Sequence, residues 1–110
     1  MKKFVVIKTD FPATHHWPDC PIPEVNFLKH PHRHLFYVVM KFRVGHNDRD
    51  IEFINMKMDV EDFIMREYYN QFLGKKSCED IAEELMNDFK ADFVSVFEDN
   101  ENGAEIYADD

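Results

Sequence analysis

Five of the six histidines of this chain fall in two short clusters. His15 and His16 stand together in FPATHHWPDC, and three more alternate in HPHRH at positions 30, 32 and 34. Alternate side chains of a β-strand point to the same face, so His32 and His34 would project side by side, with Cα atoms roughly 6–7 Å apart. Two imidazoles at that spacing can bind one metal ion, and the upstream cluster offers a third.

Three neutral imidazoles around Zn²⁺ leave a fourth position open for water or substrate, which is the arrangement of catalytic zinc sites. The ion then acts as a Lewis acid on a bound oxygen. His15 or His16 would join His32 and His34, and His30 could replace either member of the alternate pair. The plainer alternative is that these histidines simply lie in a polar loop.

Charge and composition argue against several classes of protein. Asp and Glu number 22 against 13 Lys and Arg, and the net charge of -9 repels phosphate backbones. The chain has no apolar run of about 18 residues, and polar residues from position 8 onward end the apolar start too early for a secretory signal. Two cysteines make no disulfide framework. We expect one domain over residues 1–110, in the cytoplasm, that binds neither nucleic acid nor membrane.

Apolar alternation and turn signals predict the elements that would position these residues. One helix would be capped by Asp59 and ended by Gly74, and a second would open with the capping box of Ser77 and Asp80. Asn102 and Gly103 would form a tight turn. Helices between runs of strands indicate an α+β fold with an antiparallel sheet and helices on one face. The expected strands are 3–9, 34–44, 51–57, 93–98 and 104–108, with a long irregular loop over the proline-rich residues 11–33.

The order of these motifs resembles the 6-pyruvoyl-tetrahydropterin synthase and 6-carboxy-tetrahydropterin synthase family over nearly the whole chain. The similar stretches are FPATH at a strand end, HRH leading into HLFYVVMKFRV, IEFINMKMDVEDF before a helix, SCEDIAEEL at a helix start, and VSVFED in a late strand. The resemblance implies a T-fold, with a four-stranded antiparallel sheet and two helices packed on one face. It also implies that His15, His32 and His34 bind Zn²⁺.

The same resemblance implies a ligand and an assembly. Ser77, Cys78 and Glu98 would hold the amino and ring N–H edge of a pterin, and a carboxylate suits this because it accepts two parallel hydrogen bonds. The implied activity is that of a zinc-dependent lyase acting on a dihydropterin triphosphate or a related purine-derived substrate, in pterin or 7-deazaguanine (queuosine-precursor) synthesis. T-fold proteins join sheet edges between subunits, so a homo-oligomer is implied as well.

Three features depart from the family pattern. Cys20 lies twelve residues before His32, whereas the catalytic cysteine of the family lies only a few residues before the metal pair. Arg33 replaces a glycine, on a strand position that faces away from the metal. The connection LGKKS lacks the family's Asp-His proton relay, so His16 and His30 are the candidate acid–base groups beside a catalytic Cys20. The alternatives are a non-catalytic T-fold module that binds or sequesters a purine-like or nucleotide ligand, and an oligomeric scaffold with a structural zinc.

Overall fold

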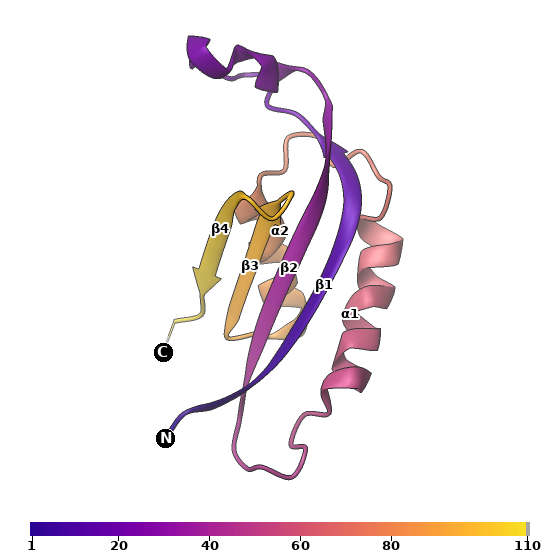
Figure 1. The fold of residues 1–110 in the computed structure, drawn as a ribbon, viewed down its shortest axis with the longest axis vertical. Coiled ribbons are helices and arrows are strands. Elements are labelled where there is room, and N and C mark those ends of the chain that lie inside the picture. Colours follow the sequence, from indigo (N-terminus) through magenta and orange to yellow (C-terminus); the bar gives the residue numbers. More distant parts are fainter. Residues whose placement is uncertain (110) are drawn as a thin grey trace.

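Two long antiparallel strands dominate the sheet in this computed structural model, which describes residues 1–109 (Figure 1). Strand β1 spans Lys3–His15 and strand β2 spans His32–Val44, and they pair without a break from one end to the other. β1 is longer than predicted, because Pro12 lies inside the strand instead of ending it. The carbonyl of Pro12 accepts a hydrogen bond from the backbone N–H of Asn70 on the side away from β2, so the missing N–H of the proline falls on the outer edge.

Two short strands complete a four-stranded antiparallel sheet in the order β1-β2-β3-β4. They are β3, Phe93–Glu98, and β4, Asn102–Tyr107, which confirms the predicted last hairpin. The tight turn lies earlier than predicted, since Asp99 and Asn100 have φ of 54° and 57° and Asn102 already pairs within β4. Gly103 serves a different purpose, because a Cβ there would lie 2.1 Å from the carbonyl oxygen of Val96.

The strand predicted at residues 51–57 is wrong, because this segment opens helix α1, Phe53–Glu67. Glu52 caps it, and Asp59 does not, since the Glu52 carboxylate accepts the backbone N–H groups of Ile54 at 3.2 Å and Asn55 at 2.9 Å. The apolar side chains Met56, Val60 and Ile64 recur every four residues and pack on the core. This helical period overrides the short alternation seen in the sequence.

Helix α2, Cys78–Phe89, follows the predicted capping box. The Ser77 hydroxyl accepts the backbone N–H of Asp80 at 3.1 Å, and the Asp80 carboxylate accepts the backbone N–H of Ser77 at 3.0 Å. The two helices lie on the same face of the sheet, α1 over β1 and α2 over β3 and β4, as predicted (Figure 1). The connection between β1 and β2 holds the short 3₁₀ helix η1, Pro23–Lys29, and projects beyond the sheet. Within residues 1–109, no helix has the length and apolar character needed to cross a membrane.

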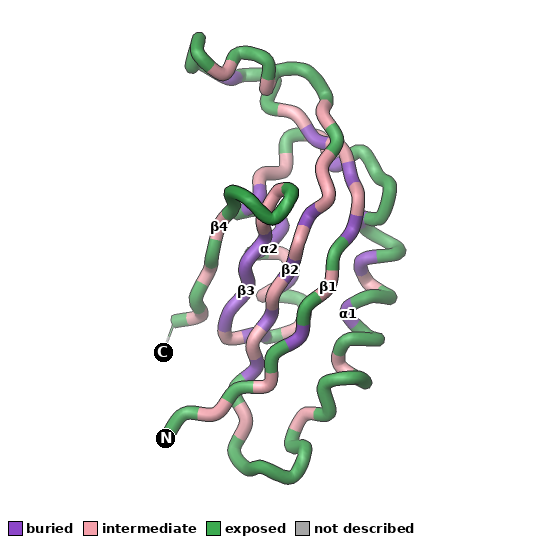
Figure 2. Tube along the Cα trace, viewed as in Figure 1, coloured by how far each residue is buried: buried purple, intermediate pink, exposed green. Residues whose placement is uncertain are grey.

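The hydrophobic core fills the space between the sheet and the helices, and buried positions run along the strands in Figure 2. Phe11 of β1 stacks between Phe36 of β2 and Tyr68 at the end of α1, with ring centroids 5.3 Å and 5.2 Å away. This aromatic stack lies directly next to the histidine cluster, because the ring of His15 meets the ring of Phe36 edge-on at 5.2 Å. The core therefore supports one wall of the candidate site.

Tyr68 links the core to the segment before α2, and its replacement by phenylalanine tests that link. Its hydroxyl donates a 2.7 Å hydrogen bond to Glu84, which also binds the Lys76 ammonium group at 2.9 Å. We expect Tyr68→Phe to lower the free energy of unfolding by about 1–2 kcal/mol, because a charge-assisted hydrogen bond is lost at a buried ring. Urea denaturation measures this. Tyr69→Phe, at a partly exposed ring, should cost less than about 0.5 kcal/mol, and equal losses for the two variants would contradict the assignment.

Candidate metal centre

The paired ends of β1 and β2 bring three imidazoles together. His15 is directly opposite His32, and His34 lies opposite Ala13, so all three histidines stand on the helix-covered face of the sheet. The ring centroid of His15 is 4.6 Å from that of His32 and 5.6 Å from that of His34, and His32 and His34 are 5.0 Å apart. The predicted convergence of His32 and His34 with a histidine of the upstream cluster is therefore found, and that histidine is His15.

A carboxylate completes the cluster. Glu98 ends β3 opposite Phe36, which is two residues beyond His34 on the same face of β2. One oxygen, Oε2, lies 2.8 Å from Nε2 of His15, and the other, Oε1, lies 3.6 Å from Nε2 of His34. Each of the four residues offers one ligand atom, and these atoms all lie within 4.8 Å of one another. The sequence had suggested Glu98 only as a ligand-gripping group, because its distance from the histidines depends on a pairing between segments over 60 residues apart.

Each of the three histidines is oriented by an oxygen atom at its Nδ1. The partner of His15 is the carbonyl oxygen of Lys76 at 2.8 Å, and the partner of His32 is the carbonyl oxygen of His30 at 2.8 Å. The partner of His34 is Oδ2 of Asp99 at 2.6 Å. Carbonyl and ionised carboxylate oxygens only accept hydrogen bonds, so each Nδ1 carries the proton and each Nε2 keeps its lone pair free for a cation.

The burial of His15 also fits a bound cation. Its Nε2 is buried and makes no hydrogen bond of acceptable geometry with any residue of the described chain, although Glu98 is only 2.8 Å away. With the proton of the ring on Nδ1, Nε2 has no proton to donate to the carboxylate. A buried polar atom without a partner is costly, and a metal ion among the four ligand atoms would give it one. The cluster could thus hold a metal ion.

The electrostatic field at the cluster favours positive charge. Burial lowers the pKa of His15, but nearby Glu98 and the carbonyl of Lys76 outweigh it, and the net shift is upward. The contact with His15 holds the pKa of Glu98 below its usual range, with smaller contributions from the other two histidines and against its own burial. An ionised Glu98 is the form that attracts a cation.

A pocket of about 420 Å³ opens beside the cluster. His15, His32 and Glu98 form one wall, and the start of α2 contributes Ser77 and Cys78. The three residues predicted to hold a ligand, Ser77, Cys78 and Glu98, are thus brought together next to the histidines. Burial, with help from the neighbouring carboxylates, raises the pKa of the Cys78 thiol to about 12, so this cysteine stays protonated at neutral pH.

The three candidate catalytic residues occupy different places. His16 lines the pocket and its ring lies 5.0 Å from that of Phe72. Cys20 is buried within the projecting β1–β2 connection, and neither it nor His30 lines the pocket. His30 contributes its carbonyl oxygen to His32, and its ring is not part of the cluster. Catalytic roles for these three residues stay predictions.

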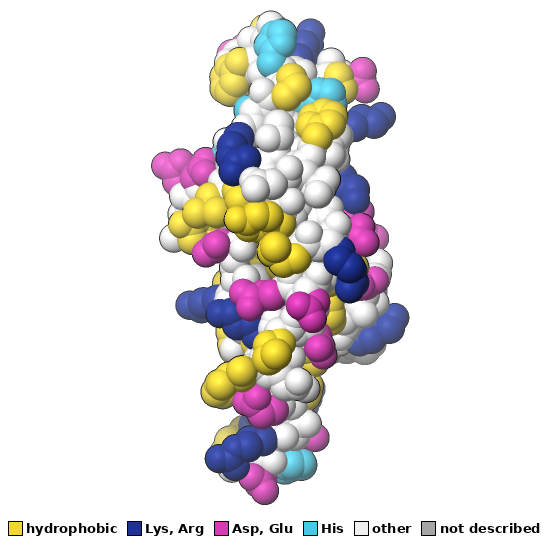
Figure 3. Space-filling model, turned by 90° about the vertical axis from the view of Figure 1, so that its right-hand side faces the viewer, with side chains coloured by type: hydrophobic (Ala, Val, Ile, Leu, Met, Phe, Trp, Pro, Cys, Tyr) yellow, Lys and Arg dark blue, Asp and Glu magenta, His cyan; other side chains and the backbone are white. Residues whose placement is uncertain are grey.

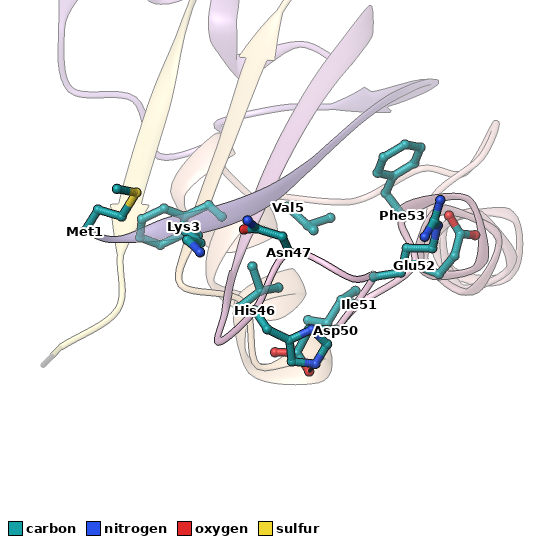
Figure 4. Close-up of a pocket in the computed structure, with 12 residues that line it drawn as sticks. Met1, Lys3, Val5, His46, Asn47, Asp50, Ile51, Glu52 and Phe53 are labelled. Atoms are coloured by element: carbon teal, nitrogen blue, oxygen red, sulfur yellow. Dashed lines mark ion pairs between the residues drawn. The ribbon is translucent and has the colours of Figure 1, made fainter.

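A larger hollow of about 650 Å³ lies at the opposite end of β1, around Lys3 and the β2–α1 connection (Figure 4). His46 and Asp50 meet there with Nε2 and Oδ1 3.4 Å apart, and the His46 side chain is 61% exposed. Figure 4 shows the two side chains together at the rim, in the charged segment of the sequence. An exposed pair of this kind is typical of a solvated turn.

No family model matches this chain, and no curated protein matches it either. Evidence for the function therefore comes from the site itself and from the short motifs of the sequence.

Metal uptake tests the cluster directly. We expect chelator-treated protein to take up one equivalent of zinc per chain and to unfold at a higher temperature with zinc than without it, because the ion binds only the folded arrangement. His32→Ala and His34→Ala should each lose most of this affinity. His46→Ala is the matched control, since it removes a histidine outside the cluster. Zinc titration against a chromophoric chelator measures the effect, and uptake by His32→Ala equal to that of the wild type would contradict the assignment.

Proposed function

We propose that this chain is a zinc-binding protein similar to the 6-pyruvoyl- and 6-carboxy-tetrahydropterin synthases, which acts on a dihydropterin triphosphate or a related purine-derived ligand. The main support is that His15, His32 and His34 meet beside a pocket that also contains Glu98 and the start of α2. Those are the positions at which the sequence resembles that family.

Zinc suits this donor set best. Three imidazole nitrogens with an oxygen or an open fourth position form a tetrahedral arrangement that Zn²⁺ adopts readily. When bound, zinc would polarise an oxygen of the ligand side chain. The residues of the chain would orient the ligand, because the pocket opens from the cluster toward the N-terminus of α2.

Ring recognition would fall to Glu98 and the start of α2, which line the pocket together. Glu98 can accept two parallel hydrogen bonds from the amino and ring N–H groups of a pterin. Ser77 and Cys78 stand at the N-terminus of α2, where the positive end of the helix dipole favours an electron-rich ring edge or an anionic group. In this role both oxygens of Glu98 would turn from His15 and His34 to the ligand.

The second candidate function is a non-catalytic module that holds the same kind of ligand. It is favoured by the protonation state of the pocket thiol, because the raised pKa of Cys78 leaves almost no thiolate at neutral pH to act as nucleophile or base. Cys20 does not line the pocket, which leaves His16 as the acid–base candidate there. Incubation of the zinc-loaded protein with dihydroneopterin triphosphate separates the two functions, because the enzyme releases a product and the module retains the compound unchanged.

Glu98→Gln distinguishes a ring-gripping carboxylate from a fourth metal ligand. If Glu98 grips the ring, we expect ligand affinity to fall roughly 100-fold, since a charge-assisted pair of hydrogen bonds is lost, and zinc affinity to change far less. Glu79→Gln is the control, because Glu79 also lines the pocket but is not part of the cluster. Isothermal titration with zinc and then with dihydroneopterin triphosphate gives both affinities. Loss of zinc from the Glu98→Gln protein would instead indicate a closed, structural metal site.

Assembly into a homo-oligomer is part of the proposal. The sheet ends in β1 on one side and β4 on the other, and a second copy placed with its β1 beside β4 continues the antiparallel alternation. The face of the sheet away from the helices exposes apolar side chains, including Phe4, Val6 and Tyr107. A partner strand added at β1 would bring its own α2 next to α1.

Exposed apolar side chains on α1 support a neighbour at this position. Ile54, Met58 and Met65 lie on one stripe of the helix and are all more than half exposed. Figure 3 shows apolar groups between charged side chains down this side of the molecule. A neighbouring α2 would cover part of this apolar stripe, which is exposed in a single copy.

Light scattering after size-exclusion chromatography tests the assembly. We expect Val6→Lys to shift the protein from an oligomer toward the monomer mass of 13.2 kDa, because a charge would be buried on the face of the sheet next to the proposed contact. Phe27→Lys is the matched control, since Phe27 is 66% exposed in the projecting connection, away from the sheet edges. A wild-type protein that elutes as a monomer at all concentrations would refute the proposed assembly.

A further inference from the structure

We propose that Asp99 is a positioning residue of the metal centre, which fixes the ring of His34 so that its Nε2 points at the ion. The inference rests on the proposed metal site and adds a residue that contacts neither the ion nor the pocket. Its main support is the 2.6 Å contact between Oδ2 of Asp99 and Nδ1 of His34, on the side of the ring away from Glu98.

Asp99 is itself held in place from two directions. Its Oδ1 accepts the backbone N–H of Leu35 at 3.0 Å, and its own backbone N–H donates to the carbonyl of Leu35 at 2.8 Å. These bonds attach the β3–β4 turn to the residue that follows His34 on β2. The carboxylate therefore cannot swing away without breaking a contact to the same strand that carries the ligand, and His34 cannot rotate without losing its partner.

The left-handed backbone at Asp99 makes this contact possible. Successive residues of a strand point to opposite faces, so a regular continuation of β3 would place Asp99 on the face away from Glu98 and the histidines. With φ of 54° the chain turns at Asp99 instead, and the carboxylate reaches back to His34. Aspartate and asparagine tolerate this conformation better than most residues. The end of β3 thus places Glu98 in the cluster, and the turn that follows places Asp99 behind the ring of His34.

His34 differs from the other two histidines in the charge of its partner. Neutral backbone carbonyls hold Nδ1 of His15 and of His32, whereas an ionised side chain holds Nδ1 of His34. A carboxylate behind an imidazole fixes the tautomer and strengthens the ring as a metal ligand. Of the three orienting groups, Asp99 is also the one that a substitution can remove, because the other two belong to the main chain.

The exposure of the Asp99 and His34 side chains distinguishes a positioning role from a purely structural one. The Asp99 side chain is 46% exposed and that of His34 is 21% exposed, and ion pairs at such positions add little to folding stability. Removing the carboxylate should therefore change metal binding much more than it changes the stability of the metal-free protein. A structural role would produce the opposite result.

The test uses Asp99→Gly, with Asn100→Gly as the matched control. Both residues have a left-handed backbone, at φ of 54° and 57°, so glycine relieves strain equally at the two positions, and Asn100 makes no side-chain hydrogen bond within residues 1–109. We expect Asp99→Gly to weaken zinc binding about 10- to 100-fold in a chelator competition assay and Asn100→Gly to leave it unchanged. The visible spectrum of the cobalt-substituted protein should change for Asp99→Gly alone.

Asp99→Asn provides a second variant that keeps both the backbone preference and a neutral acceptor. It should bind zinc with an affinity between that of the wild type and that of Asp99→Gly. Equal zinc affinity for wild type, Asp99→Gly and Asp99→Asn would overturn the role of Asp99 and leave the metal site standing. A wild-type protein that takes up no zinc would overturn both, and an Asp99→Gly protein that loses metal-free stability in proportion to its zinc affinity would show a structural role instead.

Discussion

The register between β1 and β2 is the constraint on which the site depends. His15 faces His32 only because the strands pair from Lys3 and Val44 to His15 and His32 without a break. A slip of one residue would turn every side chain of one strand to the opposite face, and His15 would leave the cluster. The same register buries Ile7, Phe11 and Ala13 against the helices, so the apolar core that fixes the pairing also fixes the histidine cluster.

Backbone contacts from a distant segment hold the end of β1 in place. The chain between α1 and α2 runs beside β1, where Thr14 pairs with Phe72 and the N–H of His16 donates to the carbonyl of Gly74. This segment continues to Lys76, whose carbonyl orients His15, while its ammonium group binds Glu84. The hydrogen bond from Tyr68 to Glu84 joins the same network. Hydrogen bonds and an ion pair therefore connect the aromatic core to the segment that orients His15.

Features with a local signal could be predicted from the sequence, and features that depend on distant segments could not. The alternation of His32 and His34 and the capping box at Ser77 are short-range patterns, and both are confirmed. The sequence predicts an irregular loop around Pro12, because the position of this proline on an edge strand, where it removes no ladder hydrogen bond, depends on neighbours that the sequence does not reveal. Residues 51–57 fitted a strand as well as a helix over so short a window, and packing of Met56 on the core decided for the helix. The link between His34 and Asp99 spans 65 residues, beyond any periodic signal.

Charge balance explains why the cluster suits a divalent cation within an acidic chain. Glu98 and Asp99 bring two negative charges to neutral imidazoles whose Nδ1 protons already point outward. A divalent ion would neutralise both carboxylates and supply the missing partner of His15 Nε2. Without an ion, a proton on His15 can meet the same need, since the pKa of His15 is shifted upward and that of Glu98 downward. A proton and a metal ion would thus compete for this cluster, whose side chains favour a positive charge.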